Sequence, residues 1–182
     1  DIPLVLGGTE VCLEVFADAS YATLDERRSI VGHLARTAKG SGAIFATVSS
    51  TKCAVTSVFE AELIAANGGV DTMVYLSHAC DELVYPTGED STVFVDNQAE
   101  IEWIKGGVSA KRSKHVDVRL YKMRHLFADG KVHIEYVPTQ ENLADILTKA
   151  LPKEQFRYLA GRVLGHDLIK DWRAAPVFRP LT

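Results

Sequence analysis

Cysteine is scarce in this sequence: the 182 residues include three, Cys12, Cys53 and Cys80, and no two of them have the C-x-x-C spacing. This scarcity excludes a disulfide-stapled miniprotein, and an odd, scattered set favours buried free thiols in a reducing compartment. Long apolar runs are also missing, so no segment is expected to span a bilayer. The first residues, Asp1-Ile2-Pro3, lack the basic and apolar regions of a signal peptide.

An initiator methionine is absent as well, which leads us to expect a piece of a larger product. The phosphate-binding motif GxxxxGKS/T, the dinucleotide motif GxGxxG and the serine-hydrolase motif GxSxG do not occur either. What is present is an ordinary composition, 47% hydrophobic and 24% charged, typical of one globular domain with a substantial core. We expect that single domain over residues 1–170, patterned from about residue 11, and a flexible tail over 171–182.

Neither sign of charge is in large excess, since the formal net charge is −4. The segment from Lys105 to Lys131 nevertheless carries eight lysines and arginines against two acids, a net of +6 that leaves −10 for the rest of the chain. A solvated helix face explains such a run when it is taken alone. A phosphate-facing patch on an otherwise acidic molecule is the alternative interpretation.

Hydrophobic patterning in the first half predicts strands followed by helix. Three strands with short links, and therefore antiparallel, are expected at 11–17, 29–37 and 43–50, with a hairpin turn at Lys39–Gly42. Ser57 and Glu60 have the capping-box spacing at the start of a helix. That helix is expected to end at Gly68-Gly69, and a second helical stretch over 71–83 can continue it.

The second half alternates strands with helices. A continuous apolar run at 92–95 is typical of a buried parallel strand, and 131–137 is expected to be another strand. Helices are expected up to about residue 105, over 114–128, from Thr139 to Ala150, and around Phe156 to Leu164. The order β-β-β-α-β-α-α-β-α-α implies an α/β fold, a mixed sheet with helices packed on it.

Glu62 is the most informative acid. Its neighbours at helical spacing, Val58, Phe59, Ala65 and Ala66, are all apolar, so its side chain points with the apolar face. A lone carboxylate there is costly and needs a partner, a proton or a metal ion. A snorkelling glutamate at the rim of the core is the structural alternative.

Three more acids have informative positions. Asp96 ends the strand VFVD, where open α/β sheets hold their ligands, and a cap of the next helix is the alternative. Asp18 ends an apolar strand or serves a turn, and Asp145 has only polar helical neighbours, so a solvated face explains it alone. Together with Glu62 they can converge on one point, where like charges repel unless cations join them. Oxygen ligands of this kind suit Mg²⁺, and no histidine–cysteine cluster suits Zn²⁺.

The strings FADAS, FEAELIAA, VFVDNQAEI, KHVDVRLYKMR and VHIEYVPTQENLADILTKALP occur in this order along the chain. Together they resemble the ribonuclease H domain of copia-type LTR retrotransposon polyproteins, over residues 11 to 169. The resemblance implies a ribonuclease H-like mixed five-stranded sheet, three antiparallel strands and then parallel ones, with helices on its faces. It also implies cleavage of the RNA strand of RNA–DNA hybrids during reverse transcription.

Carried over by position, the resemblance makes Asp18, Glu62, Asp96 and Asp145 the catalytic and metal-binding set for two Mg²⁺ ions, with Mn²⁺ as a substitute. Products would carry 5′-phosphate and 3′-hydroxyl ends. Cellular ribonucleases H of this type usually have a histidine in the loop before the last aspartate. Here the loop VPTQENLAD has none, so no proton shuttle is expected there.

Expected partners are the hybrid and the reverse transcriptase domain of the same polyprotein, with no membrane, in cytoplasmic virus-like particles or the nucleus. Asn97 and Gln98 are placed to reach sugar hydroxyls, or they are simply the first residues of a helix. The residues expected to clamp phosphates are Lys111, Arg112, Lys114 and His115. His115 could instead hold its loop. A non-catalytic or domesticated module that binds nucleic acid or protein is the alternative function.

Overall fold

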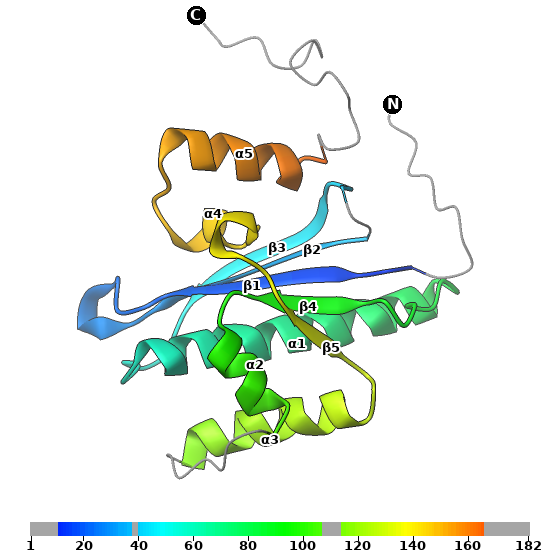
Figure 1. Cartoon of the computed structure of the whole chain (residues 1–182), viewed down its shortest axis with the longest axis horizontal. Helices are drawn as coiled ribbons and strands as arrows, with labels where there is room; N and C mark the ends of the chain where they lie inside the picture. The colour runs from blue at the N-terminus through cyan, green and yellow to red at the C-terminus, as the bar shows by residue number, and fades with distance from the viewer. Residues whose placement is uncertain (1–10, 38–39, 107–113, 166–182) are drawn as a thin grey trace, which may run out of the picture.

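The chain forms a five-stranded mixed sheet in the order β3-β2-β1-β4-β5 (Figure 1). The computed structural model describes residues 11–37, 40–106 and 114–165. The strands are β1 Glu14–Ser20, β2 Ile30–Arg36, β3 Ala43–Ser50, β4 Thr92–Val95 and β5 His133–Tyr136. The pairs β1–β2 and β2–β3 are antiparallel, whereas β1–β4 and β4–β5 are parallel. The predicted α/β class with a mixed five-stranded sheet is confirmed.

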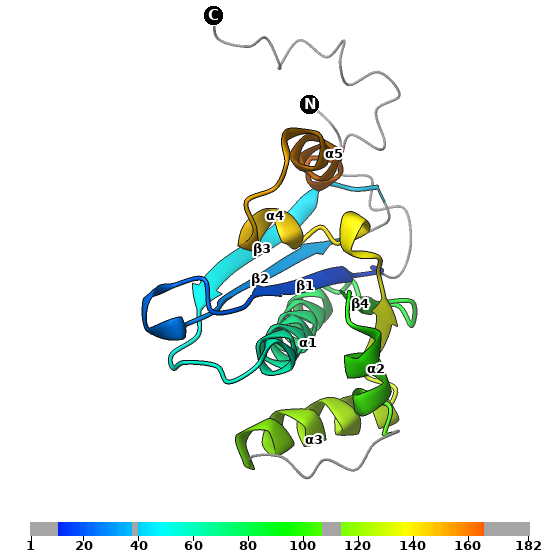
Figure 2. The same ribbon diagram turned by 60° about the vertical axis from the view of Figure 1, so that its left-hand side comes forward.

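Helices pack on both faces of this sheet. They are α1 Val58–Glu82, α2 Gln98–Ile104, α3 Lys114–Ala128, α4 Asp145–Thr148 and α5 Lys153–Val163, with 3₁₀ turns at Asp25–Arg27 and Thr139–Glu141. In Figure 2, α1 and α3 lie below the sheet and α4 and α5 lie above it. The predicted order of strands and helices is confirmed. The expected tail at 171–182 and part of the hairpin turn at 39–42 lie outside the described residues.

Strand β1 is buried on both faces because helices cover it from both sides. Side chains alternate along a strand, so Val15 and Ala17 join the larger core with α1 while Phe16 joins the smaller core with α4 and α5. Asp18 follows in the same alternation as Phe16 and is fully buried, with 0% of its surface exposed. The strand therefore carries a carboxylate into the interior on the α4 side.

The helix stop expected at Gly68-Gly69 is wrong, because α1 runs through both residues, and the alternative that the stretch over 71–83 continues the helix is confirmed. The two glycines are there for packing: a Cβ on Gly68 would lie 2.4 Å from Cε1 of His33, and one on Gly69 would lie 3.1 Å from Cβ of Ala17. Nε2 of His33 lies 3.0 Å from the carbonyl oxygen of Ala65, which accepts its hydrogen bond. Burial lowers the pKa of His33 below its ordinary value. The glycines thus let α1 press against the sheet.

The expectation of one helix from Thr139 to Ala150 is also wrong, since only a 3₁₀ turn and the four-residue α4 form there. Asn142 explains the interruption. Its side chain is fully buried, its Oδ1 accepts from the backbone N–H of Ala144 (3.1 Å), and its Nδ2 donates to the carbonyl of Ala17 (3.0 Å). An asparagine that bonds the backbone in this way competes with helical pairing and ties the segment to β1.

Gly32 allows α4 to sit directly on the sheet. It stands opposite Asp18 in the β1–β2 pair. A Cβ at Gly32 would lie 2.9 Å from Cβ of Leu147 and 2.9 Å from Cγ2 of Thr148, which is closer than real contacts of this kind. The absence of a side chain on β2 therefore brings the end of α4 over the buried carboxylate of β1.

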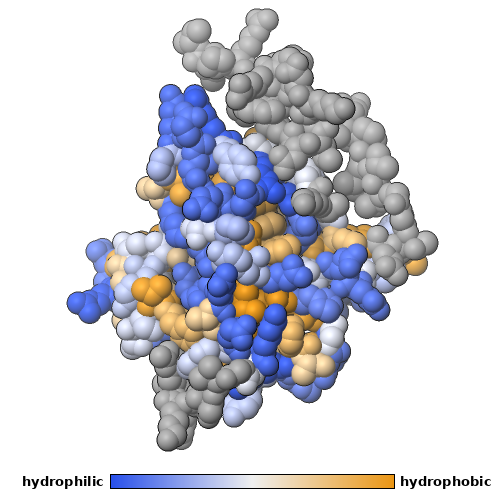
Figure 3. Space-filling view, in the orientation of Figure 1, coloured by the Kyte–Doolittle hydropathy of each residue, from blue (hydrophilic) through white to orange (hydrophobic). Residues whose placement is uncertain are grey.

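On the face seen in Figure 3, hydrophilic residues cover much of the surface and hydrophobic ones come through in patches between them. The three cysteines are free thiols, but the expectation of buried thiols is wrong for Cys53, which is exposed. Within the described ranges, no helix combines the length and the apolar character that crossing a bilayer requires.

Candidate metal centre

Two of the four acids come together because of the register between neighbouring parallel strands. Phe16 of β1 pairs with Phe94 of β4. Asp18 and Asp96 lie two residues after these phenylalanines. The carboxyl ends of parallel strands meet at one edge of a sheet, which is where ligands bind in open α/β folds. The parallel pairing therefore sets these two carboxylates side by side.

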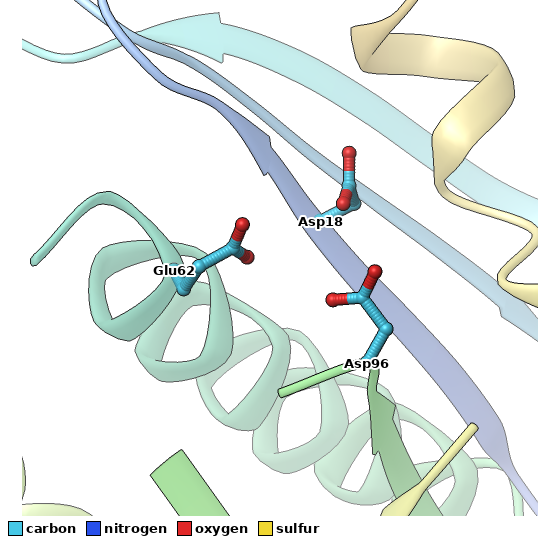
Figure 4. A group of neighbouring side chains, drawn as sticks. All are labelled: Asp18, Glu62 and Asp96. Carbon is cyan, nitrogen blue, oxygen red and sulfur yellow. The ribbon is translucent and has the colours of Figure 1, made fainter. Parts of the chain in front are cut away.

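Glu62 joins them from helix α1. One carboxylate oxygen from each of Asp18, Glu62 and Asp96 can be chosen so that all three lie within 4.8 Å of one another. Figure 4 shows the three side chains pointing to a common space from β1, from α1 and from the end of β4. The helical neighbours that made Glu62 informative in the sequence hold α1 against the sheet, since Ala65 and Ala66 are buried in the core.

Burial and mutual repulsion disfavour the ionised forms of Glu62 and Asp18. Burial, and then the charges of Asp18 and Asp96, raise the pKa of Glu62 to about 8. Burial also raises the pKa of Asp18 to about 6, in spite of hydrogen bonds from Lys149 and Thr148 that favour its charged form. Without a cation the group is thus strained electrostatically, and a cation would relieve that strain.

Asp145 lies beside this group but is not one of its three members. The alternative of a solvated helix face at Asp145 does not hold, because only 3% of its surface is exposed. Lys149 connects it to the others: Nζ donates to Oδ1 of Asp145 (2.8 Å) and to Oδ1 of Asp18 (2.9 Å). The hydroxyl of Thr148 also donates to Oδ2 of Asp18. Helix α4 therefore supplies the fourth acid, and Lys149, the residue directly after it, supplies a positive charge.

Sequence reasoning missed Lys149, which it counted only as a polar neighbour of Asp145. Partial burial alone would lower the pKa of this ammonium group, but its hydrogen bonds to Asp145 and Asp18 raise it above its ordinary value. The spacing of four residues between an acid and a lysine was the available signal, since such residues face each other on a helix.

Asp96 is held from the loop that follows β5. The hydroxyl of Thr139 donates to Oδ2 of Asp96 at 2.9 Å, and Asp96 itself is half-buried. The alternative that Asp96 caps the next helix does not apply, because Asn97 caps α2 by accepting from the backbone N–H of Glu100 at 3.3 Å. Asp96 thus has one oxygen engaged and keeps the other available to the shared space.

An open depression of about 510 Å³ leads to the acids. Its lining residues are Val58, Glu62, Asp96, Asn97, Gln98, Ala99 and Tyr136. Gln98 is exposed on its rim, whereas the side-chain oxygen of Asn97 is used in the helix cap. Tyr136, which is 43% exposed, was not singled out from the sequence. The depression offers amides and an aromatic ring next to the carboxylates.

Glu100 is a third residue, after Lys149 and Tyr136, that was not predicted from the sequence. It is 1% exposed, and its Oε1 has no hydrogen-bond partner among the described residues. Burial, and then the charges of Glu62 and Asp96, raise the pKa of this carboxyl well above its ordinary value. It stands on α2 one helical turn beyond Asp96, where the alternation of polar and apolar residues gave no hint of burial.

The basic segment is only partly described. Lys111 and Arg112 lie outside the described residues, and Lys114 and His115 begin α3 with side chains that are also outside the description. Two other charges of the segment are used inside the fold: Lys122 pairs with Asp71 of α1, and Arg124 donates twice to the carbonyl of Trp103, at 2.9 and 2.6 Å. Part of the positive run therefore fastens α3 to its neighbours.

The grouped donors suit a hard divalent cation. In the part of the chain that the structure describes, the grouped ligand atoms are carboxylate oxygens, the donors that Mg²⁺ and Mn²⁺ prefer. The raised pKa values of Asp18 and Glu62 point the same way, because a bound cation would stabilise both charged forms. The residues present therefore fit a metal site of this type.

Comparisons with known sequences find similarity to proteins of mobile elements. No family model matches it. It is 35% identical over 154 residues to the retrovirus-related Pol polyprotein from transposon TNT 1-94 of Nicotiana tabacum, covering 84% of this chain and 11% of that protein. It is 28% identical over 154 residues to the Ty1-ER2 Gag-Pol polyprotein of Saccharomyces cerevisiae, covering 82% of this chain and 8% of that protein. The chain thus spans about a tenth of these relatives.

Comparisons with solved structures show the fold. The N-terminal RNase H domain of Rv2228c from Mycobacterium tuberculosis aligns with a TM-score of 0.57 at 19% identity, over 83% of this chain and 97% of that one. LC11-RNase H1, isolated from compost by a metagenomic approach, aligns with a TM-score of 0.55 at 18% identity, over 82% of this chain and 98% of that one. Almost the whole length of each neighbour is thus covered by the alignment.

Proposed function

This chain belongs with the Pol polyproteins of LTR retrotransposons and has the ribonuclease H fold, and on that premise we propose that it hydrolyses the RNA strand of RNA–DNA hybrids. The observation that carries the proposal is the convergence of Asp18, Glu62 and Asp96, with one oxygen of each within 4.8 Å of the others. A related solved structure, LC11-RNase H1 in complex with an RNA/DNA hybrid, has a TM-score of 0.57 with this chain. It supports the choice of substrate.

Two Mg²⁺ ions, or Mn²⁺ in their place, are the proposed cofactors. Asp18 would contact both ions, Glu62 and Asp96 would hold one, and Asp145 would hold the other. When bound, such ions activate an attacking water and stabilise the oxygen that leaves, giving 5′-phosphate and 3′-hydroxyl products. The protein fixes Asp18 through Thr148 and Asp96 through Thr139, so that these carboxylates need little rearrangement when a substrate arrives.

Substrate contacts are proposed along the depression beside the acids. Gln98 and Tyr136 line it next to Asp96, where an amide can reach sugar hydroxyls and a ring can stack on a sugar or base. We also propose that Lys111, Arg112, Lys114 and His115 bind backbone phosphates. In that case affinity for the hybrid falls steeply as salt rises. The reverse transcriptase domain of the same polyprotein is the proposed protein partner.

The test is incubation of the chain with end-labelled RNA–DNA hybrid in Mg²⁺ beside the variant Asp96→Asn. We expect the unaltered chain to shorten the RNA strand and leave the DNA strand intact, and the variant to lose at least about 100-fold in rate. Asp90→Asn, at an exposed residue outside the depression, is the matched control and should cleave normally. Binding of hybrid without cleavage at high protein concentration would favour the non-catalytic module instead.

A further inference from the structure

Lys149 is in an unusual place for a lysine. Its ammonium group lies between two buried carboxylates, 2.9 Å from Oδ1 of Asp18 and 2.8 Å from Oδ1 of Asp145. The side chains of these acids are 0% and 4% exposed, whereas that of Lys149 is 31% exposed. A positive charge therefore already sits in the position from which one ion would contact both acids.

The other part of the centre is free of such a charge. Among the residues that the structure describes, neither Glu62 nor Asp96 forms an ion pair. The hydrogen bond to Asp96 comes from the uncharged hydroxyl of Thr139 and engages only one carboxylate oxygen. A cation that enters between Asp18, Glu62 and Asp96 thus meets three carboxylates. Only one of them, Asp18, is paired with an ammonium group.

We propose that Lys149 is an internal cation that occupies the Asp18–Asp145 position, so that a divalent ion bridges these two carboxylates only after the ammonium group has left. The inference rests on the proposed metal-dependent function and adds an order to it. The position among Asp18, Glu62 and Asp96 fills first, and the position beside Asp145 fills second and more weakly.

The local structure gives Lys149 a way out. Helix α4 ends at Thr148, and Lys149 itself has extended backbone angles, φ −127° and ψ 146°, so its side chain is not held by a further helical turn. Its four methylene groups and its partial exposure allow the ammonium group to move into water without a change in the sheet. Displacement then requires movement of one side chain only.

The experiment is calorimetric titration of the whole chain with Mn²⁺ alone, without nucleic acid, using Lys149→Met. Methionine keeps the unbranched shape and removes the charge. We expect the unaltered chain to bind one ion in the accessible range and Lys149→Met to bind two, with the second at least about tenfold tighter than in the unaltered chain. Identical isotherms for the two proteins would overturn the proposal.

Two controls separate charge from structure. Lys149→Arg keeps a positive charge at the site and should retain binding of a single ion. Lys153→Met removes an exposed lysine at the start of α5 and should also behave like the unaltered chain. A second ion in either control would contradict the assignment to the charge of Lys149.

In the metal-free variant, Asp18 and Asp145 are buried acids that have lost the counterion Lys149, and this loss could prevent folding. Mn²⁺ should then restore its folding, because the ion takes the place of the ammonium group, and a chain that stays unfolded in saturating Mn²⁺ would overturn the proposal. Failure of the proposed function is distinguishable: an unaltered chain that neither binds Mn²⁺ nor cleaves hybrid overturns both ideas. An active chain with isotherms identical to those of Lys149→Met overturns only this one.

Discussion

A carboxyl group with a pKa of about 8 is mostly protonated at neutral pH, and Glu62 is such a group in the metal-free protein. Its pKa in the unfolded chain is near 4.5, so the folded state binds the proton more tightly. The stability that this gives is complete below pH 4.5 and is lost as the pH rises through 8. The shift of Asp18 has the same sign and acts at lower pH.

We therefore expect the chain in EDTA to be less stable at pH 9 than at pH 6, and Glu62→Gln to reduce that loss. The variant should be more stable than the unaltered chain at pH 9 by about 1–2 kcal/mol, since its side chain carries no charge to desolvate. Urea unfolding at the two pH values measures the difference. The exposed Glu102→Gln is the control, and an equal gain there would contradict the assignment.

Glu100 gives a second expectation at this scale. Its carboxyl is 1% exposed, one of its oxygens has no partner within the described ranges, and it stands beside the buried apolar residues Ile101 and Ile104. Glu100→Met should raise the free energy of unfolding by about 1–3 kcal/mol, because an apolar side chain of similar length has no polar atom to desolvate. Chemical denaturation at pH 8 measures it, and Glu102→Met should change stability by less than about 0.5 kcal/mol.

The sequence could predict single residues where local pattern and burial agree. Glu62 was found because its helical neighbours are apolar, and three of them, Phe59, Ala65 and Ala66, do pack into the core, whereas Val58 is exposed. Glu100 and Lys149 were missed because their surroundings come from segments distant in the chain. Lys149 contacts Asp18 across a sequence separation of 131 residues. Patterns at helical spacing relate only residues three or four apart, so they could not predict this contact.

At the scale of elements, the approach of α4 to β2 decides where the fourth acid lies. Helix α4 leaves no space for a side chain at Gly32, because a Cβ there would lie 2.9 Å from atoms of both Leu147 and Thr148. Gly32→Ala should therefore push α4 outward, cost about 1–3 kcal/mol of stability, and weaken the hydrogen bond from Thr148 to Asp18. The melting temperature and the rate of hybrid cleavage should both be lower than in the unaltered chain.

Gly42→Ala is the matched control for that change. A Cβ at Gly42 would meet its nearest atoms, in Leu164, at 3.4 Å, which is close to ordinary contact. It should thus leave both stability and cleavage nearly unchanged. Equal effects of the two alanine substitutions would show that the spacing between α4 and β2 is unimportant for the centre.

Elements were predicted best where one physical signal dominated. The strands of the first half and the cap of α1 follow from β-prone runs and from Ser57, whose hydroxyl accepts from the N–H of Glu60 at 3.1 Å. The predictions at Gly68-Gly69 and after Thr139 were wrong because a glycine pair predicts the end of a helix and a run of helix-forming residues predicts a helix. In the fold, contact with His33 and the side chain of Asn142 override those local preferences.

For the molecule as a whole, the gathered carboxylates couple stability to metal. A divalent ion that binds only the folded chain should stabilise it by about 2.7 kcal/mol at 100 times its dissociation constant. We expect Mn²⁺ to raise the melting temperature and EDTA to reverse the rise. Asp18→Asn should largely remove the response, whereas Asp90→Asn, outside the depression, should keep it. An equal rise in all three proteins would indicate binding elsewhere.

A mixed sheet covered by helices followed from the order of elements, because three antiparallel strands and later crossovers leave few arrangements, whereas the five-stranded ribonuclease H-like sheet was implied by the family resemblance. Which acids share a space could be argued for Asp18 and Asp96 from neighbouring strand ends. The place of Asp145 could not, since it depends on a glycine of β2 and on a buried asparagine that interrupts a helix. Such contacts arise only when the whole sheet and its covering helices are assembled.

The position of Lys149 in the chain has a consequence for biosynthesis. A ribosome releases the segments that carry Asp18, Glu62 and Asp96 well before it releases the lysine that compensates the most deeply buried of these acids. Until then, closing the sheet over Asp18 encloses an acid without its counterion, which is unfavourable. The nascent chain is therefore expected to remain open at that strand until α4 and Lys149 have been translated, and their arrival completes the folding of this centre.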